Sequence, residues 1–344
     1  MQHGSGIMLS LFVIFVAAQI GAELARRLKL PGVVGEIVAG CVVGPSLLGW
    51  IAPSEALDVL AEIGVVLLLF SVGLETRIDE MKRVGRSAFL VGVLGVAVPF
   101  ALGSLWAHGA GFNWDKSLFI AAAFVATSAG ITARVLQELG VLQREESRVI
   151  LGAAVIDDIL AMLLLGIVTA LQAGADVQIG TLAVVVLEAV GFVLAIGLFG
   201  TRLARRWSHG LSHLKLCSPL TVALALCLGL AFLSTQFGLA AIIGAFLAGM
   251  VASETPQREK LEHQTQPLLA LMTPFFFVLT GAKIELAQLA TVDVLLTLAL
   301  ITVIALLSKL VGGYLGALAL GKRSALIVGV GMMPRGEVGV VIAS

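Results

Sequence analysis

The chain has 344 residues, and its composition excludes most classes of protein. It contains 22 Lys and Arg and 22 Asp and Glu residues, which together make up 13% of the chain, against roughly 25% in a soluble domain. Apolar residues make up 59%, there are 39 glycines, and the mean hydropathy is +1.05. Such a chain cannot cover a water-facing surface, so we predict an integral membrane protein. The zero net charge and the absence of basic stretches interleaved with aromatic residues exclude nucleic acid as a partner.

The N-terminal segment and the cysteines add two expectations. Residues 1–4 lack the basic start of a signal peptide, and the first apolar run ends at Arg26, so this run is expected to remain as a membrane span. Cys41, Cys217 and Cys227 stand within apolar runs and lack the spacing of a disulfide framework or a metal site. We therefore interpret them as small apolar side chains and expect no resident cofactor.

Long, continuous apolar segments follow one another through the chain, which indicates helical spans rather than the alternating strands of an outer-membrane barrel. At about 20 residues per span, we predict an all-α polytopic membrane protein with about 12 spans. The spans are expected at residues 7–28, 31–50, 56–75, 86–107, 116–139, 146–173, 179–201, 217–236, 238–253, 265–284, 292–319 and 324–344.

Basic residues alternate between the connections of these spans. Eighteen of the 22 Lys and Arg residues lie at every second connection, beginning with Arg26 and Arg27, whereas the intervening connections contain Glu55, Asp58 and Asp115. Cytoplasmic loops are enriched in Lys and Arg. We therefore expect a multi-pass protein of the cell (inner) membrane with its N-terminus outside.

Two short matches indicate an internal repeat. Residues 70–75 (FSVGLE) resemble residues 278–283 (VLTGAK) at an offset of 208, and residues 39–40 (AG) match residues 248–249 at an offset of 209. An odd number of spans separates the two units, so they would be inverted in the membrane. Inverted repeats are typical of secondary transporters, whose sites lie at the midplane on discontinuous helices.

Two spans have centres that are unfavourable for a helix. Residues 127–132 (TSAGIT) and residues 334–340 (PRGEVGV) concentrate small, hydroxyl, Pro and Gly residues, so we expect both spans to unwind at mid-depth and to expose helix ends that carry partial charge. The repeat also predicts a partner for the span at 146–173. This partner would lie beyond Ser344, so about 13 spans are expected in the complete architecture.

The strongest cluster of charge inside the membrane is Asp157-Asp158. The pair follows the polar start of its span by roughly 16 Å at about 1.5 Å per residue. Adjacent helical residues point about 100° apart, so one carboxylate can face a cavity while the other faces a neighbouring helix. A buried carboxylate can hold either a proton or a small cation. Oxygen ligands for a cation could come from both aspartates and from the hydroxyls of Thr127, Ser128 and Thr132.

Charges inside the bilayer are costly, so each basic residue there needs a function or a partner. Lys283 is expected to form an ion pair with Asp157, with snorkelling to the membrane surface as the alternative. Lys309 is expected to snorkel or to cap a helix end. Arg335 and Glu337 lie beside the predicted break in the last span, where they could offset helix dipoles or pair with each other.

These residues resemble the monovalent cation:proton antiporters, in particular the second branch with NapA-type sodium/proton exchangers and Kef-type potassium systems. The paired aspartates are the most specific element of the resemblance, which covers essentially the whole chain. It rests on residues 31–45, 127–132, 157–158, 274–283 and 334–341.

The resemblance implies one transporter domain of inverted six-helix repeats with two crossed, discontinuous helices, and it implies a homodimer. Residues 7–75 and 217–284 would form the dimerisation scaffold, residues 86–173 and 292–344 the moving core, and residues 179–201 the linker helix.

The resemblance also implies the mechanism of transport. Asp158 would be the essential carrier of cation and proton, and Asp157 would pair with the lysine that corresponds to Lys283. Kef-type members usually carry Gln-Asp at this position, so Asp-Asp favours electrogenic exchange of sodium for protons and a role in pH homeostasis. One net charge moved through 100 mV is worth about 2.3 kcal/mol, which could help to drive such exchange.

Two alternatives remain beside sodium/proton exchange. The first is a potassium/proton antiporter or Kef-type potassium efflux system, in which a cytosolic regulatory domain could follow Ser344. The second is an intramembrane aspartyl protease, which needs its two carboxylates on facing helices rather than on neighbouring residues of one helix. We therefore expect a transporter and not an enzyme, with a monovalent cation and protons as its cargo.

Overall fold

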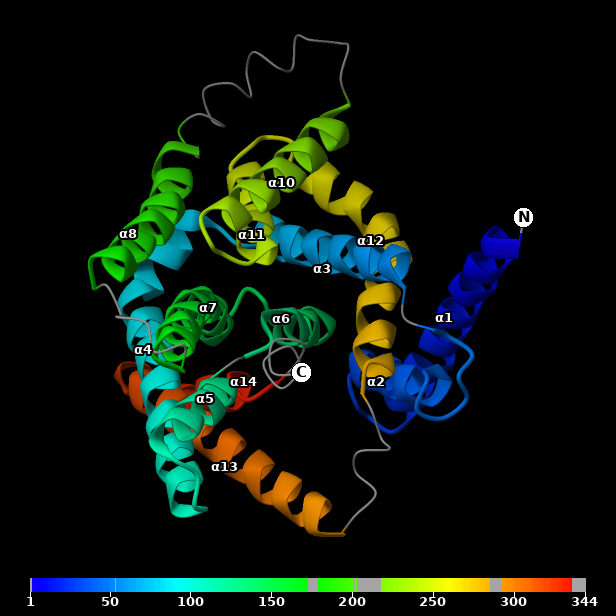
Figure 1. The fold of residues 1–344 in the computed structure, drawn as a ribbon. Coiled ribbons are helices and arrows are strands. Elements are labelled where there is room, and N and C mark those ends of the chain that lie inside the picture. Colours follow the sequence, from blue (N-terminus) through cyan, green and yellow to red (C-terminus); the bar gives the residue numbers. More distant parts are fainter. Residues whose placement is uncertain are drawn as a thin grey trace.

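The computed structural model describes residues 2–52, 54–125, 127–172, 179–200, 202, 218–284 and 292–335, and within them all regular structure is helical (Figure 1). The helices are α1 (Gln2–Arg27), α2 (Gly32–Val43), α3 (Glu55–Glu75), α4 (Ile78–Gly109), α5 (Trp114–Val125), α6 (Ala129–Glu138), α7 (Glu145–Gln172), α8 (Ile179–Ala195), the π-helical η1 (Ile196–Gly200), α10 (Pro219–Gln236), α11 (Ala241–Ser253), α12 (Arg258–Ala282), α13 (Val292–Gly316), the 3₁₀-helical η3 (Leu318–Leu320) and α14 (Lys322–Gly331).

The expectation of a polytopic helical protein is confirmed. Seven helices of the described chain, α1, α3, α4, α7, α10, α12 and α13, are long and apolar enough to cross a membrane. The predicted span at residues 116–139 consists of two helices, α5 and α6, which are separated by the predicted break.

The helices in two predicted spans end earlier than expected. The span expected at 31–50 is helical only to Val43, because the next residue, Gly44, is extended (φ −71°, ψ −179°) and precedes Pro45, a position where helical backbone is disfavoured. The span expected at 324–344 is helical as α14 only to Gly331, and the chain from Met333 to Arg335 is not helical. The rest of that span lies outside the described residues.

Packing divides most of the helices into two groups, which lie on different sides of the molecule (Figure 1). In the scaffold group, α3 packs on α11 and α12, α2 packs on α1 and α12, and α10 packs on α11. In the core group, α4 packs on α5, α7 and α13, and α14 packs on α13 and α7. Helix α6 packs on α7 and also contacts α2 and α3, so it connects the core group to the scaffold group.

The closest helix crossings in the scaffold group occur as pairs. Gly281 of α12 lies directly against the backbone of α2 at Ile37, and Gly73 of α3 lies directly against the backbone of α11 at Phe246. The two glycines are related by the first offset found in the sequence, and their partners Ile37 and Phe246 are related by the second. Equivalent positions of the two segments therefore make equivalent contacts.

Helices α3 and α12 cross each other at equivalent positions. Gly64 of α3 faces the backbone of Met272 of α12, and the first sequence offset relates these two residues to each other. Glycine is required at the crossing because a Cβ atom would overlap the facing backbone.

Candidate functional site

The chain between α5 and α6 crosses the chain that follows α14. Helix α6 begins after Ser128, whose Oγ accepts a hydrogen bond from the Ile131 N–H at 3.3 Å, and α5 ends at Val125. The Ser128 N–H donates to the Pro334 carbonyl at 3.1 Å, and the Thr132 hydroxyl donates to the Gly331 carbonyl at 3.4 Å. The small and hydroxyl residues that predict the break therefore hold the start of α6 against the end of α14 and the chain that follows it.

Asp157 and Asp158 lie next to each other on α7 and have different surroundings. The Asp157 side chain is fully buried, whereas Asp158 is partly exposed and lines a cavity. The rotation of about 100° between successive helical residues produces this division. One residue therefore faces the interior of the core group, and the other faces the boundary with the scaffold group.

Asp157 forms a buried ion pair with Lys309 of α13. The Lys309 Nζ lies 2.5 Å from Asp157 Oδ1, and both side chains are 0% exposed. The same Nζ donates to the Gly95 carbonyl of α4 and to the Val125 carbonyl at the end of α5, each at 2.8 Å. An ammonium group has three donors, so Lys309 uses all of them. It also offsets the partial negative charge at the C-terminal end of α5.

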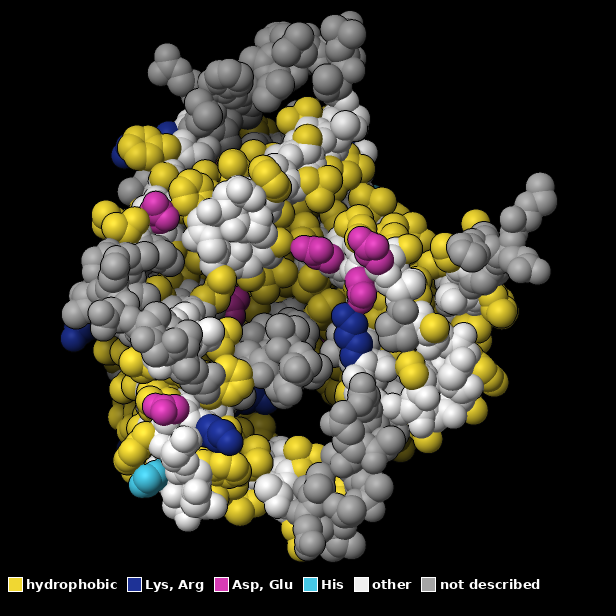
Figure 2. All heavy atoms as spheres, viewed as in Figure 1, with side chains coloured by type: hydrophobic (Ala, Val, Ile, Leu, Met, Phe, Trp, Pro, Cys, Tyr) yellow, Lys and Arg dark blue, Asp and Glu magenta, His cyan; other side chains and the backbone are white. Residues whose placement is uncertain are grey.

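The expected ion pair between Lys283 and Asp157 is wrong. Lys283 follows the last residue of α12, its side chain is about half exposed, and its Nζ lies 2.8 Å from Asp58 Oδ1 of α3. Figure 2 shows acidic and basic side chains together on the surface over these ends of α3 and α12. A lysine at the end of a span can reach polar surroundings, so Lys283 has no need of a buried partner.

Of the two alternatives expected for Lys309, the cap on a helix end is confirmed and snorkelling is wrong. Its side chain does not snorkel, since it is 0% exposed, but it does cap a helix end through the Val125 carbonyl. The sequence contained a signal for its depth: between Asp293 and Lys322, Lys309 is the only charged residue, and it stands near the middle of that stretch.

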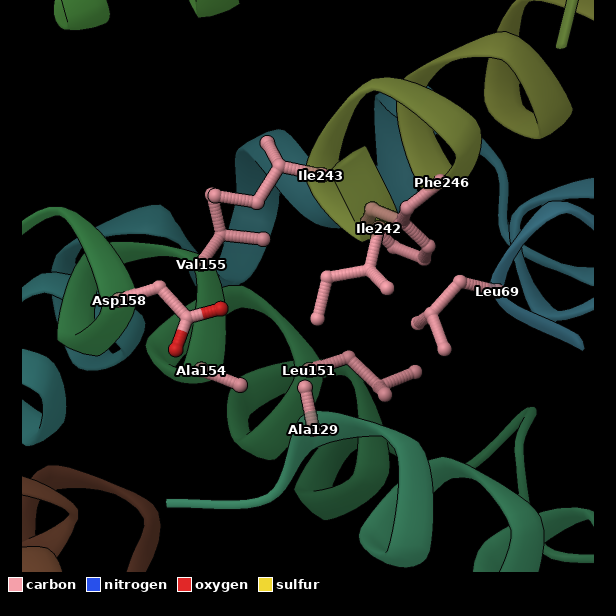
Figure 3. Close-up of a pocket in the computed structure, with 9 residues that line it drawn as sticks. All are labelled: Leu69, Ala129, Leu151, Ala154, Val155, Asp158, Ile242, Ile243 and Phe246. Atoms are coloured by element: carbon pink, nitrogen blue, oxygen red, sulfur yellow. The ribbon is translucent and has the colours of Figure 1, made fainter. Parts of the chain in front are cut away.

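Asp158 lies at a small cavity between the two groups (Figure 3). The cavity has about 20 Å³ of space, which is enough for one water molecule or for a small dehydrated cation. The Asp158 carboxylate is the charged group among its lining residues, and it lies among apolar side chains (Figure 3). The other lining residues are Leu69 of α3, Ile242, Ile243 and Phe246 of α11, Ala129 of α6, and Leu151, Ala154 and Val155 of α7.

The three predicted hydroxyl ligands are all buried at the break between α5 and α6. The Thr127 side chain interacts with the carboxylate of Asp157. Thr127 Oγ1 and Asp157 Oδ2 are both buried, and neither makes a hydrogen bond of good geometry. Ser128 caps α6, and Thr132 contacts α14. Of the three hydroxyls, that of Thr127 interacts with Asp157, whereas Ser128 and Thr132 make the contacts at the crossing.

Arg335 is the last described residue, and its Nη2 donates to the Ala305 carbonyl of α13 at 2.9 Å. It therefore ties the chain after α14 to the helix that carries Lys309. The predicted pairing of Arg335 with Glu337 cannot be placed, since Glu337 lies outside the described residues.

Polar contacts join the two groups at one end of the bundle, which we call the basic end because Arg26, Arg27, Arg77 and Arg144 lie there. The Gln137 side chain of α6 donates to Glu75 and Ser71 of α3, at 3.1 and 3.4 Å. The Gln143 side chain donates to the Glu75 carbonyl, and the Gly32 N–H of α2 donates to Glu138 of α6, each at 2.8 Å.

The geometry can be compared with known proteins. The family model described as "Sodium/hydrogen exchanger, transmembrane" matches residues 11–344. The high-affinity Na⁺/H⁺ antiporter NhaS3 of Synechocystis is 36% identical, over 98% of this chain and 82% of that protein. The Na⁺/H⁺-K⁺ antiporter GerN of Bacillus cereus is 36% identical, over 96% of this chain and 85% of that protein.

A solved structure shares the fold. The sodium proton antiporter MjNhaP1 of Methanocaldococcus jannaschii superposes with a TM-score of 0.71 at 18% identity, covering 100% of this chain and 86% of that one. The match of the family over nearly the full length, and the two relatives at 36% identity, lead to one conclusion: the chain belongs to the sodium/hydrogen exchanger family.

Proposed function

We propose that the protein exchanges a monovalent cation, with sodium as the first candidate, for protons across the membrane by alternating access, and that Asp158 carries both. The observation that supports this most directly is the position of Asp158 at a small cavity between the two helix groups, beside a neighbour whose charge is already paired. Two relatives that match most of the chain, from Synechocystis and Enterococcus hirae, are named Na⁺/H⁺ antiporters.

Competition at one carboxylate is sufficient for exchange. The Asp158 carboxylate can bind a cation or a proton but not both, so binding of one releases the other. The cavity accommodates about one water-sized species, and a cation that enters it loses most of its hydration. Asp158, with Asp157 and Thr127 close by, would supply oxygens that replace the lost water.

Lys309 supplies a second group from which a proton could be released. When its ammonium loses a proton, a neutral amine with two donors remains, and three acceptors compete for them. The carbonyls of Gly95 and Val125 can keep these donors, which frees Asp157 to contribute to the cation site. Release of protons from both Asp158 and Lys309 for each cation bound would make exchange electrogenic.

The two helix groups are the parts that we propose to move relative to each other. The scaffold group would remain fixed and form the contact between two copies in a homodimer, while the core group carries Asp158 from one side to the other. The alternation of basic and acidic connections supports an orientation with the basic end in the cytoplasm and the N-terminus outside, in the cell (inner) membrane.

Potassium is the second candidate cation. The relative GerN, which is 36% identical over most of the chain, is named a Na⁺/H⁺-K⁺ antiporter. The residue types at the site fit both sodium and potassium, because the spacing of the carbonyl and carboxylate oxygens decides which size of cation is bound.

The proposal is tested by dye quenching in proteoliposomes that carry an imposed pH gradient. Addition of sodium, lithium or potassium to wild-type protein is expected to dissipate the gradient. Asp158→Asn is expected to lower this exchange by at least about 100-fold, because an amide cannot be deprotonated to bind a cation. Lys283→Gln, at the surface, is the control that keeps exchange.

A potassium–valinomycin clamp of the membrane potential separates the electrogenic from the electroneutral mechanism. Exchange that responds to the imposed potential supports two protons per cation, and exchange that ignores it contradicts this stoichiometry. Unchanged exchange in Asp158→Asn would show that the site is elsewhere.

A further inference from the structure

Helix α4 contains a buried proline close to the ion pair. Pro99 lies in the interior of α4, which runs from Ile78 to Gly109 without interruption. In an α-helix the N–H of each residue donates to the carbonyl four residues earlier. Proline has no N–H, so the carbonyl of Gly95 has no helical donor at position 99.

The Gly95 carbonyl is one of the three acceptors of Lys309. The Lys309 Nζ donates to it at 2.8 Å while it also binds Asp157 Oδ1. A Cβ atom at Gly95 would lie 3.7 Å from both Lys309 Nζ and Asp157 Oδ1, so this stretch of α4 backbone forms one wall around the ion pair.

Close packing of α4 and α13 brings the lysine to that carbonyl. Gly312 of α13 faces the backbone of Leu94, and Gly316 faces the backbone of Val91. Both contacts lie within two turns of Lys309 along α13. The helices therefore approach closely enough for a lysine side chain to reach the backbone of α4 without leaving the buried interior.

We propose that Pro99 is a positioning residue for Lys309: by leaving the Gly95 carbonyl without a helical donor, it provides the third acceptor of the buried ammonium. The proline sets the strength with which the protonated lysine is held beside Asp157. The transport measurement that tests this proposal rests on the proposed function, whereas the thermal-unfolding measurement does not.

Substitution Pro99→Ala restores an N–H that competes for the Gly95 carbonyl. The protonated lysine then loses part of its stabilisation, so it releases its proton more readily when a cation binds. We expect the pH of half-maximal exchange on the acid side to move to lower pH by about one unit. Loss of one hydrogen bond to a charged group changes its proton affinity by about that amount. Pro267→Ala, which replaces a proline inside α12 of the other group, is expected to leave this pH unchanged.

A thermal-unfolding cycle keeps the proposal testable even if no exchange is found. Pro99→Ala is introduced into wild type and into Lys309→Gln, and the shift in Tm is measured in detergent. If Pro99 acts through Lys309, the shift differs between the two backgrounds. If wild type and Pro99→Ala both exchange and have the same pH profile, the proposal is overturned. If wild type shows no exchange, the proposed function fails, and equal Tm shifts in the two backgrounds then overturn this proposal as well.

Discussion

Asp157 and Asp158 show how far the surroundings of one residue can differ from those of its neighbour. Asp157 is closed in the core with a lysine, and Asp158 lines the boundary cavity. The helix rotation that separates them could be predicted from sequence, because it depends only on the local period. The expectation chose the wrong lysine, Lys283, although the position of Lys309 in the middle of a long uncharged stretch already indicates that it lies deep in the membrane.

The choice between Lys283 and Lys309 depends on depth and on packing. Lys309 lies well inside its span, whereas Lys283 lies at the end of its helix. Depth alone favours Lys309 as the buried partner. The close approach of α13 to α4, which brings Lys309 to Asp157, depends on glycine contacts between helices that are far apart in the chain, and no local pattern reports them.

Removal of Lys309 should therefore destabilise the protein far more than removal of Lys283. Lys309→Gln leaves Asp157 buried without its cation, which costs about 3 kcal/mol or more. Lys283→Gln breaks a half-exposed pair, for which about 0–1 kcal/mol is typical. Thermal unfolding in detergent measures both effects.

A double variant tests whether the lost stability comes from the buried charge of Asp157. Asp157→Asn added to Lys309→Gln should recover part of the lost Tm, because the uncompensated charge is removed. Equal effects of the two lysine substitutions, or no recovery in the double variant, would argue against a buried ion pair.

The break between α5 and α6 and the end of α2 depend on different kinds of residue. The break between α5 and α6 was predictable because hydroxyl and glycine residues stand at the centre of an apolar segment. The end of α2 at Val43 was missed because Gly44-Pro45 lies within a segment whose overall hydropathy continues. Hydropathy measures membrane preference, whereas backbone conformation before a proline decides where a helix stops.

The glycine crossings make a prediction about element packing. Gly281→Ala would place a Cβ atom into the backbone of α2 at Ile37, and the two helices must separate to accommodate it. We expect a loss of about 1–3 kcal/mol, as for other overpacked contacts, seen as a lower Tm.

The matched control is Gly229→Ala in α10. A Cβ atom there meets nothing within 4 Å, so the substitution should be neutral or stabilising by up to about 1 kcal/mol, since alanine favours the helix over glycine. A similar loss at both positions would show that helix propensity, rather than the crossing, sets the effect.

At the scale of the whole molecule, two groups of helices meet along a boundary that contains Asp158. Hydropathy predicts membrane-crossing helices, which the described residues confirm; the total number of spans and their direction stay predictions. The polar contacts at the basic end could not be inferred from the sequence. Gln137, Glu75 and Gln143, which make them, resemble any other polar residues at the ends of spans. Their role depends on α6 lying against α3.

Loss of these contacts should open the cavity toward the basic end. In a variant without the native cysteines, Leu69→Cys places a thiol at the lining of the cavity. Adding Gln137→Ala removes the hydrogen bonds to Glu75 and Ser71. We expect labelling by a membrane-impermeant maleimide in inside-out vesicles to become roughly 10-fold faster, since two such bonds contribute on the order of 1–2 kcal/mol.

Asn113→Ala serves as the comparison, because its side chain accepts only a local hydrogen bond from the Lys116 N–H at the other end of the bundle. It should leave the labelling rate of Leu69→Cys unchanged. If Gln137→Ala has no larger effect than Asn113→Ala, the contacts at the basic end do not control access to Asp158.

The polar contacts at the basic end also have a consequence for how often the boundary opens. Hydrogen bonds from Gln137, Gln143 and Gly32 contribute about 1 kcal/mol each, so together they favour the closed boundary by a few kcal/mol. A gap of that size leaves the minor state at about 0.1–10% of molecules. A cation that binds the minor state about 10⁴-fold more tightly than the major state reverses populations of about 1:99, without input of energy beyond that of binding itself.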